Sequence, residues 1–312
     1  MSAISRREFF AKSAAGAAAA AVLAANIKTL KAANPLGMPI GSQTYPHRAM
    51  IAEGKFVDML KQLKGIGVDQ IELCGFLNGG TFYPEFKSLM ADGKATRKII
   101  EDNGLKAISC HFMFTELRDN LRQAINWSKD MGLEQIMVPT IKSSIPGQPL
   151  VAQVGKELEE AKRLIDDFHK MATEINKEGM RAGAHNEAFD LVKLPDGTFI
   201  YDHEIQMSDP KLVGFQFQMS TYNNGMVAAD YFKKYPGRFF SMHVQDLKLN
   251  EKTPVNPQTG RGGTPPQTAV GKGGLNWAAT WAAAPTGGVK NFFVEQNMEL
   301  SKESIVALKA MR

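Results

Sequence analysis

Acidic, amide and histidine side chains recur along the 312-residue chain at or just after short apolar segments. Imidazole and carboxylate groups bind divalent metals of borderline softness, and both can transfer protons near neutral pH. The side chains concerned are Glu72, His111, His185, Asn186, Glu187, Gln216, Gln218, His243, Asp246, Glu295, Gln296 and Asn297. One such histidine is more often a structural group, but three of them with several carboxylates predict a metal site or an acid–base site.

The elements that position these groups follow from hydrophobic periodicity. From Pro39 onward, short apolar runs alternate with longer segments of helical period. The predicted strands are Ile40–Tyr45, Gln70–Cys74, Lys106–His111, Gln135–Pro139, Arg181–His185, Leu212–Gln218, Phe239–Val244 and Asn291–Glu295. The predicted helices are Phe56–Gly65, Ala95–Asn103, Leu117–Met131, Val154–Lys177, Met226–Tyr235, Trp277–Ala284 and Lys302–Ala310. Most of the polar groups therefore lie at C-terminal ends of predicted strands.

Eight strands with interleaved helices predict an α/β fold of the closed (β/α)8 TIM-barrel type, as one domain over residues 36–312. The alternative is a doubly wound open sheet, which usually has a glycine-rich phosphate turn after its first strand. The segment Ser42–Pro46 has no such turn. In a barrel, catalytic groups lie at the C-terminal ends of the strands, where the polar residues fall.

Two segments fit this alternation less well. One βα step is blurred over Asp190–Asp209, where Leu194–Gly197 is typical of a tight turn in an inserted hairpin. Asn256–Gln267 is of low complexity and is predicted to be a long loop after the seventh strand.

The two cysteines are predicted to be free thiols. Side chains alternate along a strand, so Cys74 points into the barrel if Glu72 does. By the same rule Cys110 points outward if His111 points inward. Two such side chains cannot form a disulfide without distortion.

Residues 1–33 are predicted to be a twin-arginine export signal. Arg6 and Arg7 precede the apolar run Ala14–Ala25, which is too short and too rich in alanine for a stable membrane span. The chain is therefore expected to use the twin-arginine export machinery and to reach the periplasm.

Composition narrows the classes of partner. With 44% hydrophobic and 22% charged residues, the chain is neither disordered, nor collagen-like, nor a small disulfide scaffold. Its net charge of +5 would fall to +3 on cleavage near Ala24 or Ala25, since three basic residues and one acidic residue leave with the signal. This balance argues against a nucleic-acid partner. The oligomeric state stays open.

From Gly41 onward the chain resembles the sugar phosphate isomerase/epimerase family of xylose isomerase-like TIM barrels, in particular its exported twin-arginine members. The stretches that carry the resemblance are Gly179–Glu187, Phe240–Asp246, Val270–Gly273 with Trp277, and Gly288–Gln296, with weaker matches at Ile71–Leu73 and Ser109–His111.

The resemblance implies a divalent metal at the barrel mouth, held by His185, Gln218, His243 and Glu295. The family usually has Glu and Asp at the first two of these positions, so only one of three carboxylates remains. The implied site prefers Mn, Zn, Co or Ni over Mg.

The resemblance also implies proton transfer next to a carbonyl of an unphosphorylated sugar or keto-sugar. Glu295 is the expected base, with His185 as ligand or second acid–base group. The expected substrate contacts are Glu72, His111, Glu187, Asp246, Lys248 and Trp277. A keto-glycoside lyase or hydrolase using the same site and a non-catalytic sugar-binding relative stay open as alternatives, whereas an abasic-site nuclease is disfavoured by the few carboxylates.

Overall fold

The computed structural model describes residues 35–75, 77, 83–141, 157–187, 190–191, 193–254 and 264–311. Pro39–Ala307 forms one compact unit, and the described residues at 35–38 and 308–311 belong to a second unit. The predicted export signal at residues 1–33 lies outside the described residues. The predicted limits of the domain, 36 and 312, stay a prediction.

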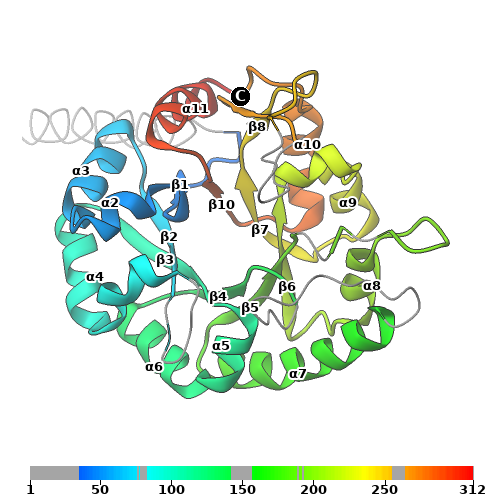
Figure 1. The fold of residues 1–312 in the computed structure, drawn as a ribbon, viewed down its shortest axis with the longest axis horizontal. Coiled ribbons are helices and arrows are strands. Elements are labelled where there is room, and N and C mark those ends of the chain that lie inside the picture. Colours follow the sequence, from blue (N-terminus) through cyan, green and yellow to red (C-terminus); the bar gives the residue numbers. More distant parts are fainter. Residues whose placement is uncertain are drawn as a thin grey trace, which may run out of the picture. The chain divides into compact units, whose positions relative to one another are not determined.

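Eight parallel strands close into a barrel in the order β1-β10-β7-β6-β5-β4-β3-β2 (Figure 1). The strands are β1 (Gly41–Gln43), β2 (Gln70–Cys74), β3 (Lys106–His111), β4 (Gln135–Val138), β5 (Arg181–His185), β6 (Val213–Gln218), β7 (Phe239–Val244) and β10 (Asn291–Val294). The ring is closed because β1 pairs with both β2 and β10. This closure confirms the predicted (β/α)8 barrel over the open sheet.

Helices surround the strands as an outer ring (Figure 1). The α-helices are α2 (Arg48–Ala52), α3 (Phe56–Ile66), α4 (Gly93–Asp102), α5 (Phe114–Asp119), α6 (Leu121–Met131), α7 (Glu157–Lys177), α8 (Ile200–Met207), α9 (Ala228–Lys234), α10 (Trp277–Gly287) and α11 (Met298–Ala310). Shorter 3-10 segments are η1 (Tyr45–His47), η2 (Pro84–Met90) and η3 (Met219–Asn224). None of the helices in the described ranges is long and apolar enough to cross a membrane.

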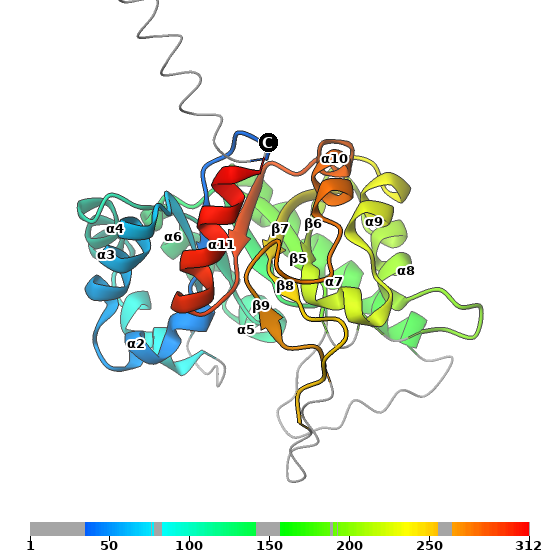
Figure 2. The same cartoon turned by 90° about the horizontal axis from the view of Figure 1, so that it is seen from above.

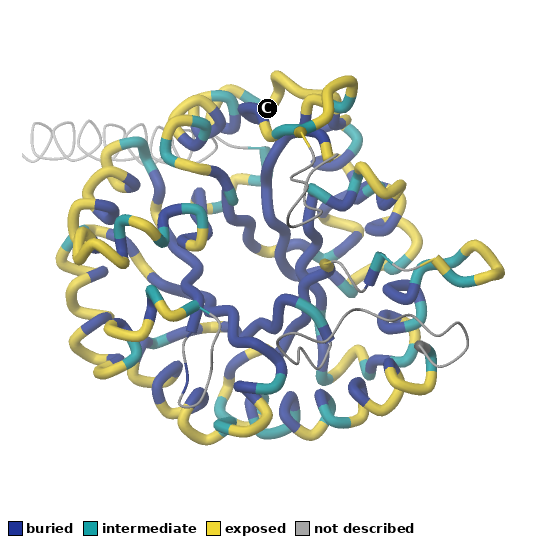
Figure 3. The backbone as a smooth tube through the Cα atoms, viewed as in Figure 1, coloured by how far each residue is buried: buried dark blue, intermediate teal, exposed yellow. Residues whose placement is uncertain are grey.

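Burial follows from this layering. Every residue of β2, β4, β7 and β10 is buried, because these strands are covered by helices outside and by one another inside (Figure 3). In α7, Ile165, Phe168, Ala172 and Ile175 are buried at spacings of three and four residues. A fully buried side chain such as Phe168 contributes about 1.5–3 kcal/mol to stability.

Two glycines show how helices end before the next strand begins. Gly67 after α3 and Gly132 after α6 have φ angles of 99° and 70°, in the left-handed region. Each cap lets the chain turn back toward the barrel within a few residues. The predicted helix end at Met131 is confirmed, and α3 ends one residue after its predicted end at Gly65.

The predicted helix Leu117–Met131 is two helices, α5 and α6. Asn120 separates them with φ −127° and ψ 29°, which is not helical backbone. Its side-chain amide donates to the Glu116 carbonyl oxygen, so it competes with the helical hydrogen-bond pattern. The predicted end at Met131 is right, whereas the helical segment begins three residues earlier than predicted, at Phe114, and is not continuous.

Two regions contain elements that were not predicted. In the blurred segment, Lys193 pairs with Phe199 in the expected hairpin, and α8 follows directly. After β7, the strands β8 (Asp246–Leu247) and β9 (Gln267–Thr268) form a short antiparallel ribbon (Figure 2). Most of the predicted loop at Asn256–Gln267 lies outside the described residues.

Cys74 and Cys110 are both buried and free, as predicted. Cys110 lies opposite Leu73 in the β2–β3 pairing, and Cys74 lies opposite His111. Burial raises the pKa of both thiols well above the usual value, so neither is activated as a thiolate.

Candidate functional site

The strand ends place the predicted site residues side by side. His185 lies opposite Gln216 in the β5–β6 pairing, and Gln218 lies opposite His243 in the β6–β7 pairing. Glu295 directly follows β10, and its side chain is 17% exposed. The cluster comprises Glu72, His111, His185, Gln216, Gln218, His243 and Glu295, of which all but Glu295 are buried.

Glu72 on β2 lies inside the barrel and is fully buried. Its Oε1 atom accepts hydrogen bonds from Gln43 Nε2 at 3.1 Å and from His243 Nε2 at 2.5 Å. Its Oε2 atom accepts from Ser109 Oγ at 2.5 Å and from Gln216 Nε2 at 2.9 Å. A buried carboxylate persists only where donors and opposite charges satisfy it. Because both oxygens are engaged by the protein, the enclosure of Glu72 does not suit the predicted role as substrate contact.

His111 is enclosed in the same network. Its Nε2 atom lies 2.8 Å from Gln216 Oε1 and 3.2 Å from Glu72 Oε1. The amide nitrogen of Gln216 donates to Glu72, so the amide oxygen faces His111 and accepts its N–H. The His111 ring stacks on His243 with centroids 5.3 Å apart. The Nε2 of His111 is thus committed to the protein rather than to a substrate.

Opposite charges stabilise one another inside the barrel. Burial would raise the pKa of Glu72, but the positive charges of His111 and His243 outweigh it and hold this pKa well below its usual range. Burial likewise opposes protonation of His243, yet the charges of Glu295 and Glu72 outweigh it and raise the pKa of His243 to about 10. Two carboxylates therefore keep a positive charge between them.

His185 and His243 face each other across the mouth. His185 Nδ1 lies 3.2 Å from the Pro139 carbonyl oxygen, which can only accept, so this nitrogen carries a hydrogen. The other nitrogen, His185 Nε2, lies 3.0 Å from His243 Nδ1. Burial and then the charges of His243 and His111 hold the pKa of His185 well below its usual value. His185 is neutral, and a proton or a cation must lie between the two facing nitrogens.

Two overlapping sets of metal-ligand atoms meet at His243. Atoms of Glu72, His111 and His243 lie within 4.8 Å of one another, but the protein already engages them in hydrogen bonds. In the other set, His243 Nδ1 lies 3.0 Å from His185 Nε2 and 3.4 Å from Glu295 Oε2. Here the far N–H of each imidazole donates to a protein oxygen, the usual second partner of metal-binding histidines. The second set meets this condition, whereas the first set is the one whose three ligand atoms all lie within 4.8 Å of one another.

Amide groups surround the Glu295 carboxylate. Gln218 Nε2 donates to Glu295 Oε2 at 2.6 Å, and Gln245 Nε2 donates to the same oxygen at 3.1 Å. Gln245 Nε2 also donates to Gln218 Oε1 at 2.7 Å, and Gln267 donates to Gln245 Oε1. Burial would raise the pKa of Glu295, but His243 and then Gln218 hold it below its usual value.

Gln218 was predicted to be a metal ligand, which requires its oxygen to face the metal. The structure instead turns its nitrogen toward Glu295 and its oxygen toward Gln245. Sequence reasoning missed Gln245, although it lies within the Phe240–Asp246 stretch that resembles the family. A polar residue directly after β7 was the signal that could have found it.

Glu187 follows β5 and is exposed to solvent, although protein surrounds its carboxyl on most sides. This enclosure and then the negative charge of Glu295 raise the pKa of Glu187 to about 7. Its backbone N–H donates to Asp190 Oδ2 at 2.6 Å, which fixes the turn after the strand. Glu187 is thus a second carboxyl group at the mouth, near Glu295 and able to change protonation near neutral pH.

Three further expected substrate contacts lie around the β8–β9 ribbon, and the protein occupies each of them. Asp246 is fully buried and accepts hydrogen bonds from the backbone N–H groups of Gly271 and Gly273 and from Trp277 Nε1 at 2.8 Å. Trp277 is 6% exposed and stacks on Trp281, so its faces are packed rather than open to a sugar. Lys248 is exposed and pairs with Glu251. These contacts fix the loop after β9 and do not favour the predicted substrate roles.

Comparison with known proteins bears on the fold. No protein-family model matches the sequence, and no curated protein matches it. Among solved structures, a sugar phosphate isomerase/epimerase from Parabacteroides distasonis is similar with a TM-score of 0.67, at 17% identity over 88% of this chain and 94% of that chain. The chain has a xylose isomerase-like TIM-barrel fold.

Two other solved structures share this fold. A xylose isomerase-like TIM-barrel protein from Mycobacterium smegmatis, in complex with magnesium, has a TM-score of 0.62 at 13% identity, over 89% of this chain and 98% of that chain. An L-ribulose 3-epimerase has a TM-score of 0.60 at 12% identity, over 88% and 94%.

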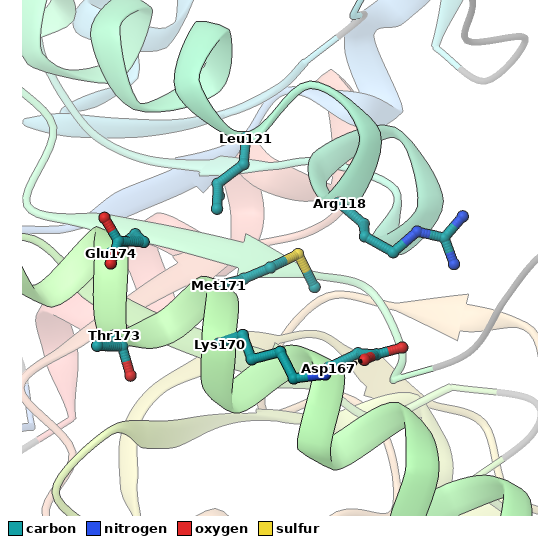
Figure 4. A pocket seen from close by; sticks show the side chains of 7 residues that line it. All are labelled: Arg118, Leu121, Asp167, Lys170, Met171, Thr173 and Glu174. Carbon is teal, nitrogen blue, oxygen red and sulfur yellow. Dashed lines mark hydrogen bonds and ion pairs between the residues drawn. The ribbon is translucent and has the colours of Figure 1, made fainter.

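A cavity of about 510 Å³ lies elsewhere on this xylose isomerase-like barrel, on the outer wall where α5, α6 and α7 meet (Figure 4). Its charged side chains are already paired: Arg118 with Asp119 at 2.8 Å, and Asp167 with Lys170 at 2.9 Å. The cavity therefore lacks the uncommitted chemical groups found at the strand ends.

Proposed function

We propose that this protein is a metal-dependent sugar isomerase or epimerase. It acts on an unphosphorylated sugar or keto-sugar by removing a proton next to a carbonyl. The observation that carries the proposal is that His185 Nε2 and Glu295 Oε2 lie 3.0 Å and 3.4 Å from His243 Nδ1, while the other nitrogen of each imidazole is bonded to a protein oxygen. The described similar structures are named as a sugar phosphate isomerase/epimerase and an L-ribulose 3-epimerase, which supports this class of reaction.

His185, His243 and Glu295 would hold the metal. Two imidazole nitrogens and one carboxylate favour Zn, Mn, Co or Ni over the Mg bound by one similar structure. When bound, the metal would supply Lewis-acid polarisation of the substrate carbonyl.

The proton is moved by carboxylates of this chain. Glu295 removes it, since the carboxylate is partly exposed at the mouth and the protein holds only one of its oxygens among the described contacts. Glu187, exposed at the end of β5, would return a proton to the adjacent carbon or to the opposite face. His185, bonded to Pro139, acts as a ligand rather than as a second acid–base group.

The test combines elemental analysis of the purified protein with incubation of aldo- and keto-sugars in deuterated water. The proposal expects stoichiometric metal and incorporation of deuterium at carbon without loss of substrate mass. Glu295→Gln should abolish the incorporation. Glu299→Gln is the matched control, because Glu299 is a largely exposed glutamate on α11. Incorporation that survives Glu295→Gln would refute the assignment.

The same experiment separates the two alternatives. Release of a free sugar or an aglycone, with loss of substrate mass, would identify a keto-glycoside lyase or hydrolase. Sugar binding that is indifferent to a chelator, with no deuterium incorporation, would identify a non-catalytic sugar-binding protein.

We also propose export to the periplasm through the twin-arginine machinery. The support is the pair Arg6 and Arg7 ahead of the apolar run Ala14–Ala25. Replacing both arginines by lysine should leave the protein in the cytoplasmic fraction. Unchanged periplasmic recovery of that variant would exclude this route.

A further inference from the structure

We propose that Gln218 and Gln245 form an amide clamp on Glu295: both donate to Oε2, the oxygen that faces His243 Nδ1, and leave Oε1 for the substrate. The inference rests on the proposed function and adds two positioning residues to it. It gives Gln218 the role of hydrogen-bond donor in place of the metal ligand that the sequence resemblance implies.

Every contact that described side chains make with the Glu295 carboxylate falls on Oε2. Gln218 Nε2 donates at 2.6 Å and Gln245 Nε2 donates at 3.1 Å, and His243 Nδ1 forms an ion pair with the same oxygen at 3.4 Å. Hydrogen bonds from an amide to an ionised carboxylate are roughly twice as strong as neutral ones. Two amide donors on one oxygen therefore fix the rotation of the carboxylate and the direction in which Oε1 points.

The direction of both amides is determined by the charges they meet. An ionised carboxylate only accepts hydrogen bonds, so Gln218 and Gln245 must each turn nitrogen toward Glu295. In that orientation Gln218 Oε1 accepts from Gln245, and Gln245 Oε1 accepts from Gln267. Reversing the Gln218 amide would set its oxygen against the carboxylate and its nitrogen against the nitrogen of Gln245.

The clamp is enclosed and anchored outside the barrel strands. Gln218 is 3% exposed and Gln245 is 2% exposed, so water competes little for their hydrogen bonds. Gln267, the outer member, lies on β9 and pairs with Leu247 of β8. The β8–β9 ribbon thereby holds Glu295 through the side-chain amides of Gln267 and Gln245. The eight-stranded barrel closes without this ribbon, and the clamp gives the ribbon a role.

The first experiment needs no metal. Melting temperatures of chelator-treated protein are measured for Gln245→Leu and Gln218→Leu, each in the presence of Glu295 and of Glu295→Gln. The clamp predicts that each leucine variant costs on the order of 2–4 °C more when residue 295 is the carboxylate than when it is the neutral amide.

Gln135→Leu is the matched control. Gln135 is likewise a buried glutamine, but it exchanges hydrogen bonds with Asn291 near the starts of β4 and β10. Its effect on the melting temperature should be the same with either residue at position 295. Equal effects of Gln245→Leu in the two backgrounds would overturn the clamp.

The second experiment uses Co(II) and separates a donor from a ligand. The clamp predicts that Gln218→Leu and Gln245→Leu both weaken Co(II) binding, by about 10–100-fold, because each loosens a group that supports the ligand set. It also predicts that the visible absorption bands of bound Co(II) keep their positions and intensities in both variants. Altered bands in Gln218→Leu alone would show that Gln218 is a ligand and would overturn the inference.

Failure of the two proposals can be told apart. If the wild-type protein binds no Co(II), Zn(II) or Mn(II), the proposed metal-dependent function fails. The clamp is then still decided by the melting temperatures, which require no metal.

Discussion

Glu72 and Glu295 lie next to opposite nitrogens of the His243 imidazole, but they differ in burial and in hydrogen bonding. Glu72 bonds His243 Nε2, is fully buried and has donors on both carboxylate oxygens. Glu295 lies near His243 Nδ1, is 17% exposed at its side chain and is held through Oε2. One residue type therefore serves two purposes on the two sides of one ring.

This difference shows that a structural carboxylate can be distinguished from a reactive one by how many of its oxygens accept hydrogen bonds from the protein. A carboxylate with all oxygens engaged has no lone pair left for a substrate, whereas one with a free oxygen at a solvent-facing mouth can act as ligand or base. Glu72 accepts a hydrogen bond that fixes the direction of the His243 ring, and Glu295 is the residue proposed to move the proton. Four predictions test this distinction.

The largest expected effect is on turnover. Glu295→Gln should lower kcat by about 10²–10⁴-fold, because it removes the base and keeps the shape. The protein should stay folded with a moderately lower melting temperature, since the amide oxygen can still accept from Gln218 but without the strength of a charged acceptor. Steady-state kinetics on a substrate found by deuterium incorporation provide the measurement. Full turnover in this variant would end the assignment of Glu295.

Glu72→Gln should act mainly on stability. Described side chains around this carboxylate are donors, so the new amide NH2 group faces donors and leaves the charge of His243 uncompensated. Breaking a buried pair in this way costs about 3–5 kcal/mol of unfolding free energy. Urea unfolding followed by circular dichroism measures it. A loss of turnover with unchanged stability would reverse the roles assigned to Glu72 and Glu295.

Gln218→Asp should have a smaller and two-sided effect. It replaces a donor by a second negative charge beside Glu295, so metal binding should tighten by at least about tenfold. Without metal, the two carboxylates repel, and the melting temperature of chelator-treated protein should fall. Isothermal titration calorimetry and thermal unfolding measure the two sides. Unchanged metal affinity would contradict the placement of the metal next to this position.

The smallest expected effect is at Asp202, a carboxylate away from the strand ends. It accepts from Lys234 Nζ at 2.7 Å, Tyr235 OH at 2.7 Å and Tyr231 OH at 3.2 Å. Burial would raise the pKa of Asp202, but the hydrogen bonds from Lys234 and Tyr235 outweigh it and lower the pKa. Asp202→Asn should therefore cost about 1–2 kcal/mol of unfolding free energy at pH 7 without changing kcat.

The sign of its pH dependence follows from the lowered pKa. Stability from Asp202 is present above the unfolded pKa of about 3.9 and is lost as the pH falls through the lower folded value. The difference between wild type and Asp202→Asn should thus shrink in acid, as measured by urea unfolding across pH 7 to pH 2. A difference that grows in acid would contradict the assigned ionisation.

The sequence alone determined the barrel and the residues at its strand ends. The predicted bounds of β2, β3, β5 and β7 agree with the structure, because apolar runs and cap glycines report on each segment separately. His185, His243 and Glu295 each lie at the C-terminal end of a predicted strand. Their location at one mouth of the barrel could therefore be predicted without knowing any contact between residues distant in sequence. The sequence predicted that these three residues and Gln218 hold a metal together, and this set of ligands stays a prediction.

Tertiary structure decided which of these side chains are still free to do chemistry. Glu72 and His243 are 171 residues apart in sequence, and Gln218 and Glu295 are 77 apart. The direction of an amide or the tautomer of an imidazole depends on the donors that such distant strands bring within 3 Å, and periodicity carries no information about that. For the same reason the sequence could name Asp246 as a polar strand-end residue, but only the folded chain shows its carboxylate bonded to Gly271, Gly273 and Trp277.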